Sequence, residues 1–574
     1  MKKEAKAVID GSAHRGTASS FPKRHALLQN QARKIACHIG QIEARLMHAA
    51  AGMGTQKRER DVEREELDLN LTMKESDVPN GFKEYRRCVS LPEKEREGLT
   101  RGFSASVTEP LHVCVVGSGP AGFYTADRML KGHEGAQVDI IDRLPTPFGL
   151  VRSGVAPDHP ETKIVVNQFS RVAANGRCSF FGNVTLGRDV SLSELRETYH
   201  TVVLAYGAES DRSLGIPGED LKGIHSAREF VWWYNGHPDM CDLSPDLKNT
   251  QSAVVLGQGN VALDVARILL CCKTELATTD IADYALDALC GSTIRKVYLV
   301  GRRGPVQAAC TAKELREILG LKNVRVCIEE ADLATSPADE EEMRSSRIQR
   351  RVYELLSKAA SAHRDNNCND QKELHFVFYR RPTRFIPSEN GSTVGAVELE
   401  KTALKVDEVN GKQVAVGTGE FEDLKCGLVL KSIGYKSLPV QGLPFDKIRG
   451  VVPNLRGRVM SSESETATVE TGLYVVGWLK RGPTGIVATN LHCAEETVAS
   501  ILEDDTKGVL RAPSDSKKHG RTGLVEILEQ KNVRFVPFSG WEKIDSKEKM
   551  AGQLRNKRRE KITTWDGLLK AANE

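Results

Sequence analysis

The sequence predicts an α/β fold built from two doubly wound units, in which helices cover a parallel β-sheet. Two short apolar runs rich in valine, 111–116 and 253–256, each lead directly into a glycine-rich loop. Each loop is followed by apolar residues at helical spacing, in 123–130 and 263–270. This strand–glycine–helix pattern occurs twice with no shorter repeat between the copies, so we expect two domains and not a solenoid.

The composition is that of a globular protein with more than one core. The 574 residues are 40% hydrophobic and 28% charged, with a formal net charge of +4. A small net charge without a long basic block argues against nucleic acid as a partner. The best apolar run, 252–272, is interrupted by Gln258, Asn260, Asp264 and Arg267, whereas a membrane span needs roughly 18 apolar residues. We therefore expect no transmembrane segment.

Cysteine usage argues against two kinds of redox centre. The 13 cysteines are scattered, and no Cys-x-x-Cys occurs. Their odd number fits a reducing compartment with free thiols. The missing motif excludes the dithiol of thioredoxin reductases and makes a cysteine-ligated iron–sulfur cluster in this chain improbable. We expect no bound metal.

Residues 1–107 are polar and charge-rich and predict a mostly disordered leader. Its end, 99–106, is similar to the close of a mitochondrial presequence, with an arginine just ahead of a Phe-Ser pair. The acidic stretch 59–68 is atypical of a presequence. A possible mitochondrial presequence and an ordinary linker both stay open.

The first glycine-rich loop predicts a Rossmann-like dinucleotide site. Gly117 permits a tight turn, Gly119 lets the backbone approach a pyrophosphate, and Gly122 allows close packing of helix on strand. Asp142 ends the next predicted strand, 137–141, at the spacing of a carboxylate that binds a ribose hydroxyl. The alternative is that Asp142 is a solvated residue at a strand end.

The second loop, Gly257-Gln-Gly-Asn-Val-Ala262, has the same pattern. The next predicted strand, 296–300, leads into Arg302 and Arg303, where an NAD site would have an acid. Guanidinium groups offer planar pairs of donors to phosphate oxygens, so this pair favours the 2′-phosphate of NADP. A basic surface turn is the alternative.

Two dinucleotide sites in one chain indicate electron transfer between two cofactors. A nicotinamide gives a hydride, and a flavin can accept it and release electrons singly. We therefore assign the first site to FAD and the second to NADPH. These residues alone do not identify the electron acceptor.

Several segments resemble the adrenodoxin reductase family of mitochondrial ferredoxin–NADP reductases. They are Asp142–Glu161, Gly257–Asp264, Val300–Pro305, Gly477–Gly485 and Phe535–Glu542. In the segment 474–478, Trp478 occupies the position at which many flavoproteins have an acidic residue, and the adrenodoxin reductase family also has tryptophan there. The resemblance runs from Leu111 to near the carboxyl terminus.

The resemblance implies a discontinuous FAD-binding domain with an NADPH-binding domain inserted into it. We expect 108–210 to form the first part of the FAD domain and 211–435 to form the NADPH domain. Residues 436–574 would supply the second part of the FAD domain and a C-terminal tail.

The resemblance also implies an activity. It is that of an NADPH:ferredoxin oxidoreductase, in which a hydride passes from NADPH to FAD and single electrons then pass to a small acidic [2Fe–2S] ferredoxin. We expect a monomer in the mitochondrial matrix. A flavin-dependent monooxygenase or a non-catalytic flavin- or NADPH-binding module would use the same two sites, but the full-length resemblance argues against both.

The family's contacts carry over to named positions here. FAD would be contacted by Ala121, Asp142, Leu150, Val184, Trp478 and the backbone of Gly485, Ile486 and Val487. NADPH would be contacted by Gln258, Gly259, Asn260, Val261, Arg302, Arg303 and Glu314, with Gly485 near the nicotinamide. Asp142 departs mildly from the family, which often has glutamate there.

Two further groups follow from the resemblance. His159 and Asp264 match a polar pair close to the flavin, where they could pass protons. The alternative is that they only anchor a turn and a helix. Arg316, Arg347 and Arg351 match basic residues that dock the ferredoxin, and charge complementarity would mainly raise the association rate. A solvated helix face is the alternative for any one of these arginines.

Overall fold

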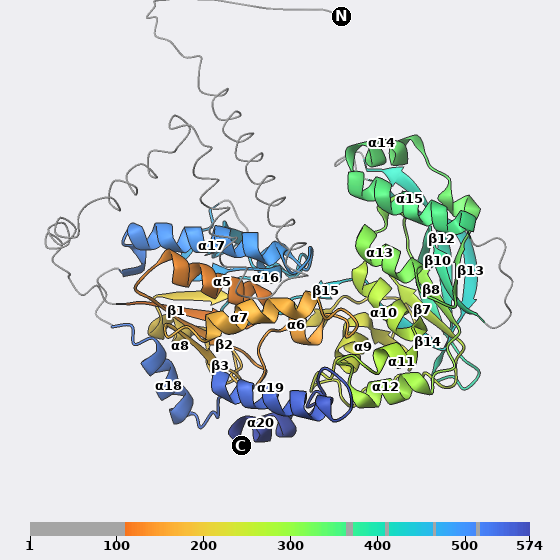
Figure 1. Ribbon diagram of the computed structural model, residues 1–574. Coiled ribbons are helices and arrows are strands. Elements are labelled where there is room, and N and C mark those ends of the chain that lie inside the picture. Colours follow the sequence, from red (N-terminus) through yellow and green to blue (C-terminus); the bar gives the residue numbers. More distant parts are fainter. Residues whose placement is uncertain (1–109, 363–370, 408–412, 463–465, 512–516) are drawn as a thin grey trace, which may run out of the picture. The chain divides into compact units, whose positions relative to one another are not determined.

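The computed structural model describes residues 110–362, 371–407, 413–462, 466–511 and 517–574 (Figure 1). The expected leader, 1–107, lies outside the described residues. Residues 108–574 form one unit that contains two large sheets.

The first sheet has seven strands in the order β16-β17-β18-β4-β1-β2-β3. Strands β18, β4, β1, β2 and β3 run parallel, and β17 and β16 add an antiparallel edge. The strands come from two separate stretches of chain: β1 (Leu111–Val116), β2 (Ala136–Ile141), β3 (Cys178–Phe181) and β4 (Thr201–Leu204), then β16 (Asn454–Leu455), β17 (Arg458–Met460) and β18 (Val469–Val475).

Helices cover both faces of this sheet, as the continuous apolar run in β1 indicates. Val113 and Val115 pack into one core with α5 (Pro120–Gly132), α7 (Val166–Ala173), α17 (Thr489–Thr506) and α19 (Phe538–Gln553). Cys114 and Val116 pack into the opposite core with α8 (Leu192–Thr198) and α18 (Arg521–Gln530). Figure 1 shows α5 and α17 on one side of the sheet and α8 and α18 on the other.

The second sheet has six parallel strands in the order β6-β14-β7-β8-β10-β9. They are β6 (Ile224–Ser226), β14 (Leu428–Lys431), β7 (Ser252–Leu256), β8 (Lys296–Val300), β10 (Lys372–Val377) and β9 (Val324–Ile328). One face is covered by α9 (Ala227–Tyr234), α10 (Asn260–Leu270), α12 (Asp283–Cys290), α13 (Ala312–Leu319) and α15 (Arg347–Ala362). The other face is covered by an antiparallel sheet of β11 (Arg380–Pro387), β12 (Val394–Val406) and β13 (Gln413–Lys425).

The chain crosses between the two sheets at a pair of short strands. β5 (Ser210–Asp211) runs antiparallel to β15 (Tyr435–Lys436), with Tyr435 opposite Asp211. Every described strand between them belongs to the second sheet or to the small sheet that covers it. We keep 211 and 435 as the proposed domain boundaries for this reason.

The remaining elements are short connections and the C-terminal end. They are α6 (Leu150–Ser153), η2 (Thr162–Val165), α11 (Lys273–Leu276), η3 (Pro305–Gln307), η4 (Glu330–Leu333), α14 (Pro337–Ser345), α16 (Trp478–Arg481), η5 (Val509–Arg511) and α20 (Trp565–Asn573). In the described part of the chain, no helix is both long enough and apolar enough to cross a membrane.

The predicted fold class, two Rossmann-like units with the second inserted into a discontinuous first, is confirmed. Strands β1 and β8 have the predicted bounds. The helices after the two glycine loops begin three residues before the predicted apolar patterns, at Pro120 and Asn260. Their first turns emerge directly from the loops, and an apolar periodicity does not mark such a turn.

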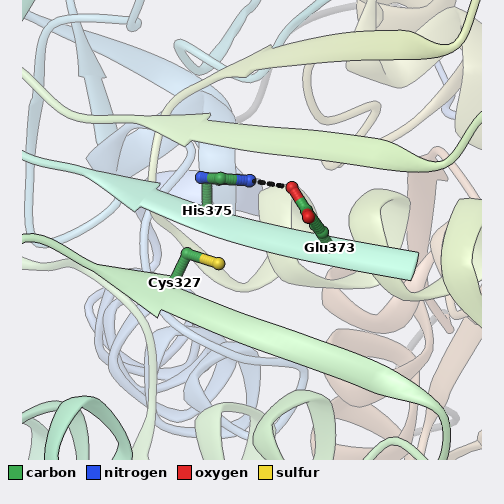
Figure 2. A group of neighbouring side chains, drawn as sticks. All are labelled: Cys327, Glu373 and His375. Carbon is green, nitrogen blue, oxygen red and sulfur yellow. Dashed lines mark hydrogen bonds and ion pairs between the residues drawn. The ribbon is translucent and has the colours of Figure 1, made fainter. Parts of the chain in front are cut away.

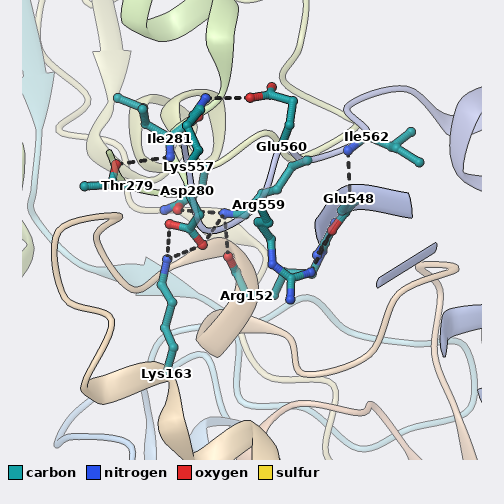
Figure 3. Close-up of polar contacts among 12 residues, drawn as sticks. Arg152, Lys163, Thr279, Asp280, Ile281, Glu548, Lys557, Arg559, Glu560 and Ile562 are labelled. Carbon is teal, nitrogen blue, oxygen red and sulfur yellow. Dashed lines mark hydrogen bonds and ion pairs between the residues drawn. The ribbon is translucent and has the colours of Figure 1, made fainter. Parts of the chain in front are cut away.

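A buried polar junction ties the segments of the first sheet to the second (Figure 3). Lys163 in η2 donates to both carboxylate oxygens of Asp280, at 2.7 and 2.8 Å. Lys561, between α19 and α20, lies 3.3 Å from the same carboxylate and donates to the Arg152 carbonyl at 3.2 Å. The residues around the junction thus come from three distant parts of the chain.

Candidate functional site

The first glycine-rich loop joins β1 to α5 with little room for side chains. Gly117 has φ +110°, and a Cβ there would lie 2.6 Å from the Ala205 carbonyl oxygen. A Cβ on Gly122 would overlap the Gly117 carbonyl oxygen. Beside Gly119, by contrast, no described atom would lie within 4 Å of a Cβ. Gly119 also begins α5 without a side chain to cap it, and open space before uncapped N–H groups suits a pyrophosphate.

Asp142 follows β2 and is fixed beside this loop. Its Oδ2 accepts hydrogen bonds from the backbone N–H and the hydroxyl of Ser118, at 2.7 and 2.6 Å. Its Oδ1 accepts from the Leu144 N–H at 2.9 Å, and the N–H of the buried Val184 donates to the Asp142 carbonyl. A carboxylate held in this way keeps lone pairs for a ribose hydroxyl. Sequence reasoning missed Ser118, although its place inside the loop was a usable signal.

The segment after β18 returns to the same loop. Gly477 has φ +71°, and a Cβ there would lie 2.6 Å from the Cβ of Ala121. The Gly477 N–H donates to the sulfur of Cys493 in α17 at 3.2 Å. The next residue, Trp478, begins α16 and stacks on Tyr435 with ring centroids 5.4 Å apart. The structure thus brings Ala121 and Trp478, predicted from distant positions, into one place.

Leu150 and the backbone of Gly485 to Val487 were also predicted to contact FAD. Leu150 begins α6 after Gly149, whose φ is +49° and whose Cβ, if present, would lie 2.9 Å from the Gly119 Cα. Leu150 is therefore next to the glycine loop. The stretch 485–487 precedes α17, and the Ile486 N–H donates to the Thr489 hydroxyl at 3.1 Å.

The second glycine-rich loop repeats the geometry of the first. Gly257 has φ +130°, and a Cβ there would overlap the Ser432 carbonyl oxygen. No described atom would lie within 4 Å of a Cβ on Gly259, which begins α10. The loop therefore leaves the same opening before a helix amino terminus. Val261, in the first turn of α10, is half-buried beside it.

Two side chains of this loop are already bonded within the protein. Gln258 donates to the carbonyl oxygens of Leu299 and Val377, at 3.0 and 3.2 Å. The Asn260 Oδ1 accepts from the Thr311 N–H at 2.8 Å, just before α13. Both side chains hold the loop in place, which leaves mainly backbone groups for a nucleotide.

Arg302 and Arg303 follow β8 and are both exposed. Their carbonyl oxygens accept from the Thr402 hydroxyl and the Tyr379 N–H, at 2.8 and 3.2 Å, so the turn is fixed. Neither guanidinium forms an ion pair with any carboxylate of the described ranges. The pKa of Arg303 is lowered, first by partial burial and then by the positive charge of Arg302. An anion between the two side chains would relieve that repulsion.

His159, in the turn before η2, lies in a polar cluster with residues of α10 and α13, two helices that cover the second sheet. Its Nε2 lies 2.8 Å from the Glu317 Oε1 and 3.8 Å from the Glu314 Oε2, both on α13. Its Nδ1 lies 4.0 Å from the Asp264 Oδ1 on α10. Because a carboxylate only accepts hydrogen bonds, Nε2 carries the hydrogen toward Glu317 and Nδ1 faces Asp264. The structure thus brings together three of the expected site residues, the pair His159 and Asp264 and the expected NADPH contact Glu314, and adds Glu317.

The Asp264 carboxyl has an unusual environment for an acid. Burial raises its pKa to about 6, and Glu314 adds to the rise, while Arg267 and His159 oppose it. Arg267 Nη1 lies 2.8 Å from Asp264 Oδ1, an ion pair whose angles do not meet hydrogen-bond geometry. A carboxyl with a pKa near 6 can exchange a proton close to neutral pH.

Comparison with known proteins identifies the family. Residues 111–320 match the pyridine nucleotide-disulphide oxidoreductase family. The chain is 66% identical to the mitochondrial NADPH:adrenodoxin oxidoreductase of Arabidopsis thaliana over 477 residues, which cover 83% of this chain and 98% of that protein. The chain belongs to the NADPH:adrenodoxin oxidoreductase family. The human member is 46% identical over 497 residues, which cover 85% of this chain and 97% of that protein.

A solved structure supports the same membership. This chain superposes on FprA of Mycobacterium tuberculosis, solved in complex with NADPH, with a TM-score of 0.75 and 39% identity. The match covers 81% of this chain and the whole of that one. The match to the pyridine nucleotide-disulphide oxidoreductase family begins at the first residue of β1 and ends at the residue after α13.

The arginines expected to dock the partner lie on two packed helices of this family member. Arg316 is on α13, and Arg347 and Arg351 are on α15; all three are exposed. Arg351 pairs with Glu354 at 2.9 Å, one turn along the helix. Ile348, between the α15 arginines in sequence, is 70% exposed. Two of the three arginines are therefore one helical turn apart on α15, with an exposed apolar side chain next to them in sequence.

Cys327 on β9 and Glu373 and His375 on β10 offer three metal-ligand atoms within 4.8 Å of one another (Figure 2). The Glu373 carboxylate, however, already pairs with Arg325 at 2.6 Å and with Lys296 at 3.2 Å. A divalent cation would have to approach both of these positive charges. The cluster therefore fits a cross-strand ion-pair network better than a metal site.

Proposed function

We propose that this chain is an NADPH:ferredoxin oxidoreductase that carries FAD and reduces a [2Fe–2S] ferredoxin of the adrenodoxin type. When bound, the two cofactors supply the redox chemistry, a hydride from NADPH and a flavin that passes electrons on singly. The observation that carries the proposal is the pair of glycine loops with open, uncapped helix amino termini, joined by one polar cluster around His159.

The first loop and its neighbours hold FAD. The N–H groups at the start of α5 bind the pyrophosphate, and Asp142 accepts from a ribose hydroxyl. The rest of the cofactor is contacted by residues of the loop and of four further segments: Gly117, Gly122, Leu150, Val184, Trp478, Gly485, Ile486 and Val487.

The second loop holds NADPH. The backbone of Gln258 to Val261 faces the pyrophosphate, and Arg302 and Arg303 bind the 2′-phosphate. Glu314 and Gly485 line the nicotinamide end. This assignment gives Gln258 and Asn260 backbone contacts only, since their side chains hold the loop.

His159 and Asp264 form the proton-handling pair of the site. His159 Nδ1 faces the Asp264 carboxyl, whose pKa near 6 lets it exchange a proton with water at neutral pH. The pair keeps charge balanced during turnover without itself carrying the electrons.

The exposed arginines Arg316, Arg347 and Arg351 form the docking surface for the acidic ferredoxin. Opposite charge steers the encounter and selects the partner. The protein acts as a monomer in the mitochondrial matrix, in keeping with relatives that are named as mitochondrial proteins.

The test is to purify the protein with FAD and to measure electron flow anaerobically and in air. We expect NADPH, far more than NADH, to drive ferricyanide reduction, and little O2 to be consumed in the absence of ferredoxin. A monooxygenase would instead consume O2 in proportion to NADPH when given an organic substrate. Cofactor binding without any turnover would identify a non-catalytic module and overturn the proposal.

A further inference from the structure

Arg267 is a buried cation at the place where the two sheets' segments meet. Its side chain is 2% exposed, and it lies on α10, which follows the second glycine loop. Its Nε and Nη2 donate to the two carboxylate oxygens of Asp158, at 2.7 and 3.0 Å. Asp158 precedes His159 in the turn that leads into η2. A planar fork of this kind fixes both partners in distance and in angle.

The same guanidinium reaches the other members of the polar cluster. Nη1 lies 2.8 Å from Asp264 and 3.9 Å from Glu314, and Nε lies 4.0 Å from Glu317. One arginine therefore faces four carboxylates, three of which also lie within 4.0 Å of a His159 ring nitrogen. Buried carboxylates without such a cation would repel one another and take up protons.

From this geometry we propose that Arg267 is a positioning residue for flavin reduction by NADPH. Its bidentate hydrogen bond to Asp158 holds the turn that contains His159 against α10 and α13. Its third nitrogen, Nη1, keeps the Asp264 carboxyl ionised. It acts through His159 and Asp264 and does not itself need to touch a cofactor. The inference deepens the proposed function and rests on it.

The groups around Asp264 support this role. Arg267 is on its own helix, His159 is in the turn before η2, and Glu314 and Glu317 are on α13. The buried Tyr234 on α9 and the half-buried Tyr435 on β15 also lie close enough to be influenced by its charge. Burial raises the pKa of Asp264, and among the neighbouring groups Arg267 does most to lower it. The loss of Arg267 should therefore raise that pKa further.

The experiment is anaerobic stopped-flow mixing of the FAD-loaded protein with NADPH at a series of pH values from 5.5 to 8.5. The loss of flavin absorbance is recorded as the measure of flavin reduction. For Arg267→Met we expect the rate per bound flavin to fall on the order of tenfold to a hundredfold, as small misplacements at a reacting centre do. The midpoint of the pH profile should also move upward. Arg267→Lys keeps the charge but not the fork, so the midpoint should return toward that of the unchanged protein while the rate stays low.

Arg458→Met is the matched control. Arg458 is also largely buried and donates to both carboxylate oxygens of one aspartate, Asp504, at 2.7 and 2.8 Å, but it lies on β17, beside the edge strand β16 of the first sheet. Its loss should lower the melting temperature and leave the bleaching rate per flavin and the pH midpoint unchanged. If Arg267→Met does not fold, Asp158→Asn breaks the same fork with a change of one atom and should slow bleaching in the same direction.

The outcomes separate this inference from the proposed function. If NADPH fails to bleach the unchanged protein, the proposed function is wrong. If NADPH bleaches it normally, and the Arg267 and Asp158 variants keep that rate and that pH midpoint, the positioning role is wrong. A loss confined to FAD content or melting temperature, as in Arg458→Met, would likewise make Arg267 a purely structural residue.

Discussion

Gly477 lies so close to Ala121 that a Cβ on Gly477 would stand 2.6 Å from the Ala121 Cβ. This contact joins the last parallel strand of the first sheet to the first glycine loop, although the residues are far apart in sequence. The C-terminal part of the chain therefore packs so closely on the loop that position 477 has no room for a side chain.

Gly477→Ala should accordingly lose FAD. The new methyl group would push Ala121 away from the position that the pyrophosphate requires, and a positive φ adds strain of about 1–3 kcal/mol. Gly508→Ala is the control, because its φ is +73° but no described atom would lie within 4 Å of its Cβ. The flavin-to-protein absorbance ratio after purification checks this, and equal ratios in the two variants would contradict it.

Changing Arg302 and Arg303 to alanine should raise the Michaelis constant for NADPH and leave that for NADH nearly unchanged. The lost contacts reach only the 2′-phosphate, and each charged hydrogen bond contributes about 1.5–3 kcal/mol. Steady-state ferricyanide reduction with each nucleotide measures the effect. Arg344→Ala, on the exposed helix α14, serves as control. A similar rise for both nucleotides would remove the case for a 2′-phosphate site.

The two glycine loops and the arginine pair were predictable because their requirements are local. A tight turn with positive φ, an opening before a helix and a charge after the next strand all leave a signal within a few positions. The fork between Arg267 and Asp158 leaves none, since it joins residues more than 100 positions apart. Glu317 was missed for a related reason: a polar residue on a helix is usual until a fold supplies its partners. His159 and Asp264 were found only through the family resemblance.

The buried junction at Asp280 predicts a pH-dependent stability. Burial lowers the pKa of Lys561 from 10.5 to about 7, with Lys163 lowering it further and Asp280 opposing the shift. Between pH 7 and pH 10.5 the Lys561 amine binds more protons in the unfolded state than in the folded state. Lys561 therefore makes the free energy of unfolding rise as pH rises from 7 toward 10. Lys561→Met removes the titrating group, and the rise in melting temperature over that window should shrink. The exposed Lys570→Met should keep the slope of the unchanged protein; an unaltered slope in Lys561→Met would refute the assignment.

Reversing the charge at any two of Arg316, Arg347 and Arg351 should slow ferredoxin-linked cytochrome c reduction sharply. Ferricyanide reduction should not change, because that small acceptor needs no docking surface. Each exposed ion pair contributes about 1 kcal/mol or less, so single changes should be modest, whereas reversal replaces attraction with repulsion. The effect should be largest at low ionic strength. A ferredoxin-linked rate that responds neither to these reversals nor to salt would place the docking surface elsewhere.

Sequential anaerobic mixing tests the central claim most directly. The FAD-loaded protein is first reduced with one equivalent of NADPH and is then mixed with an oxidised [2Fe–2S] ferredoxin, while the flavin and iron–sulfur absorbances are followed separately. We predict that NADPH bleaches the flavin and that two equivalents of ferredoxin are then reduced for each NADPH consumed, as the flavin absorbance returns. A flavin that NADPH reduces, but that ferredoxin cannot reoxidise at a rate sufficient for turnover, would contradict the account.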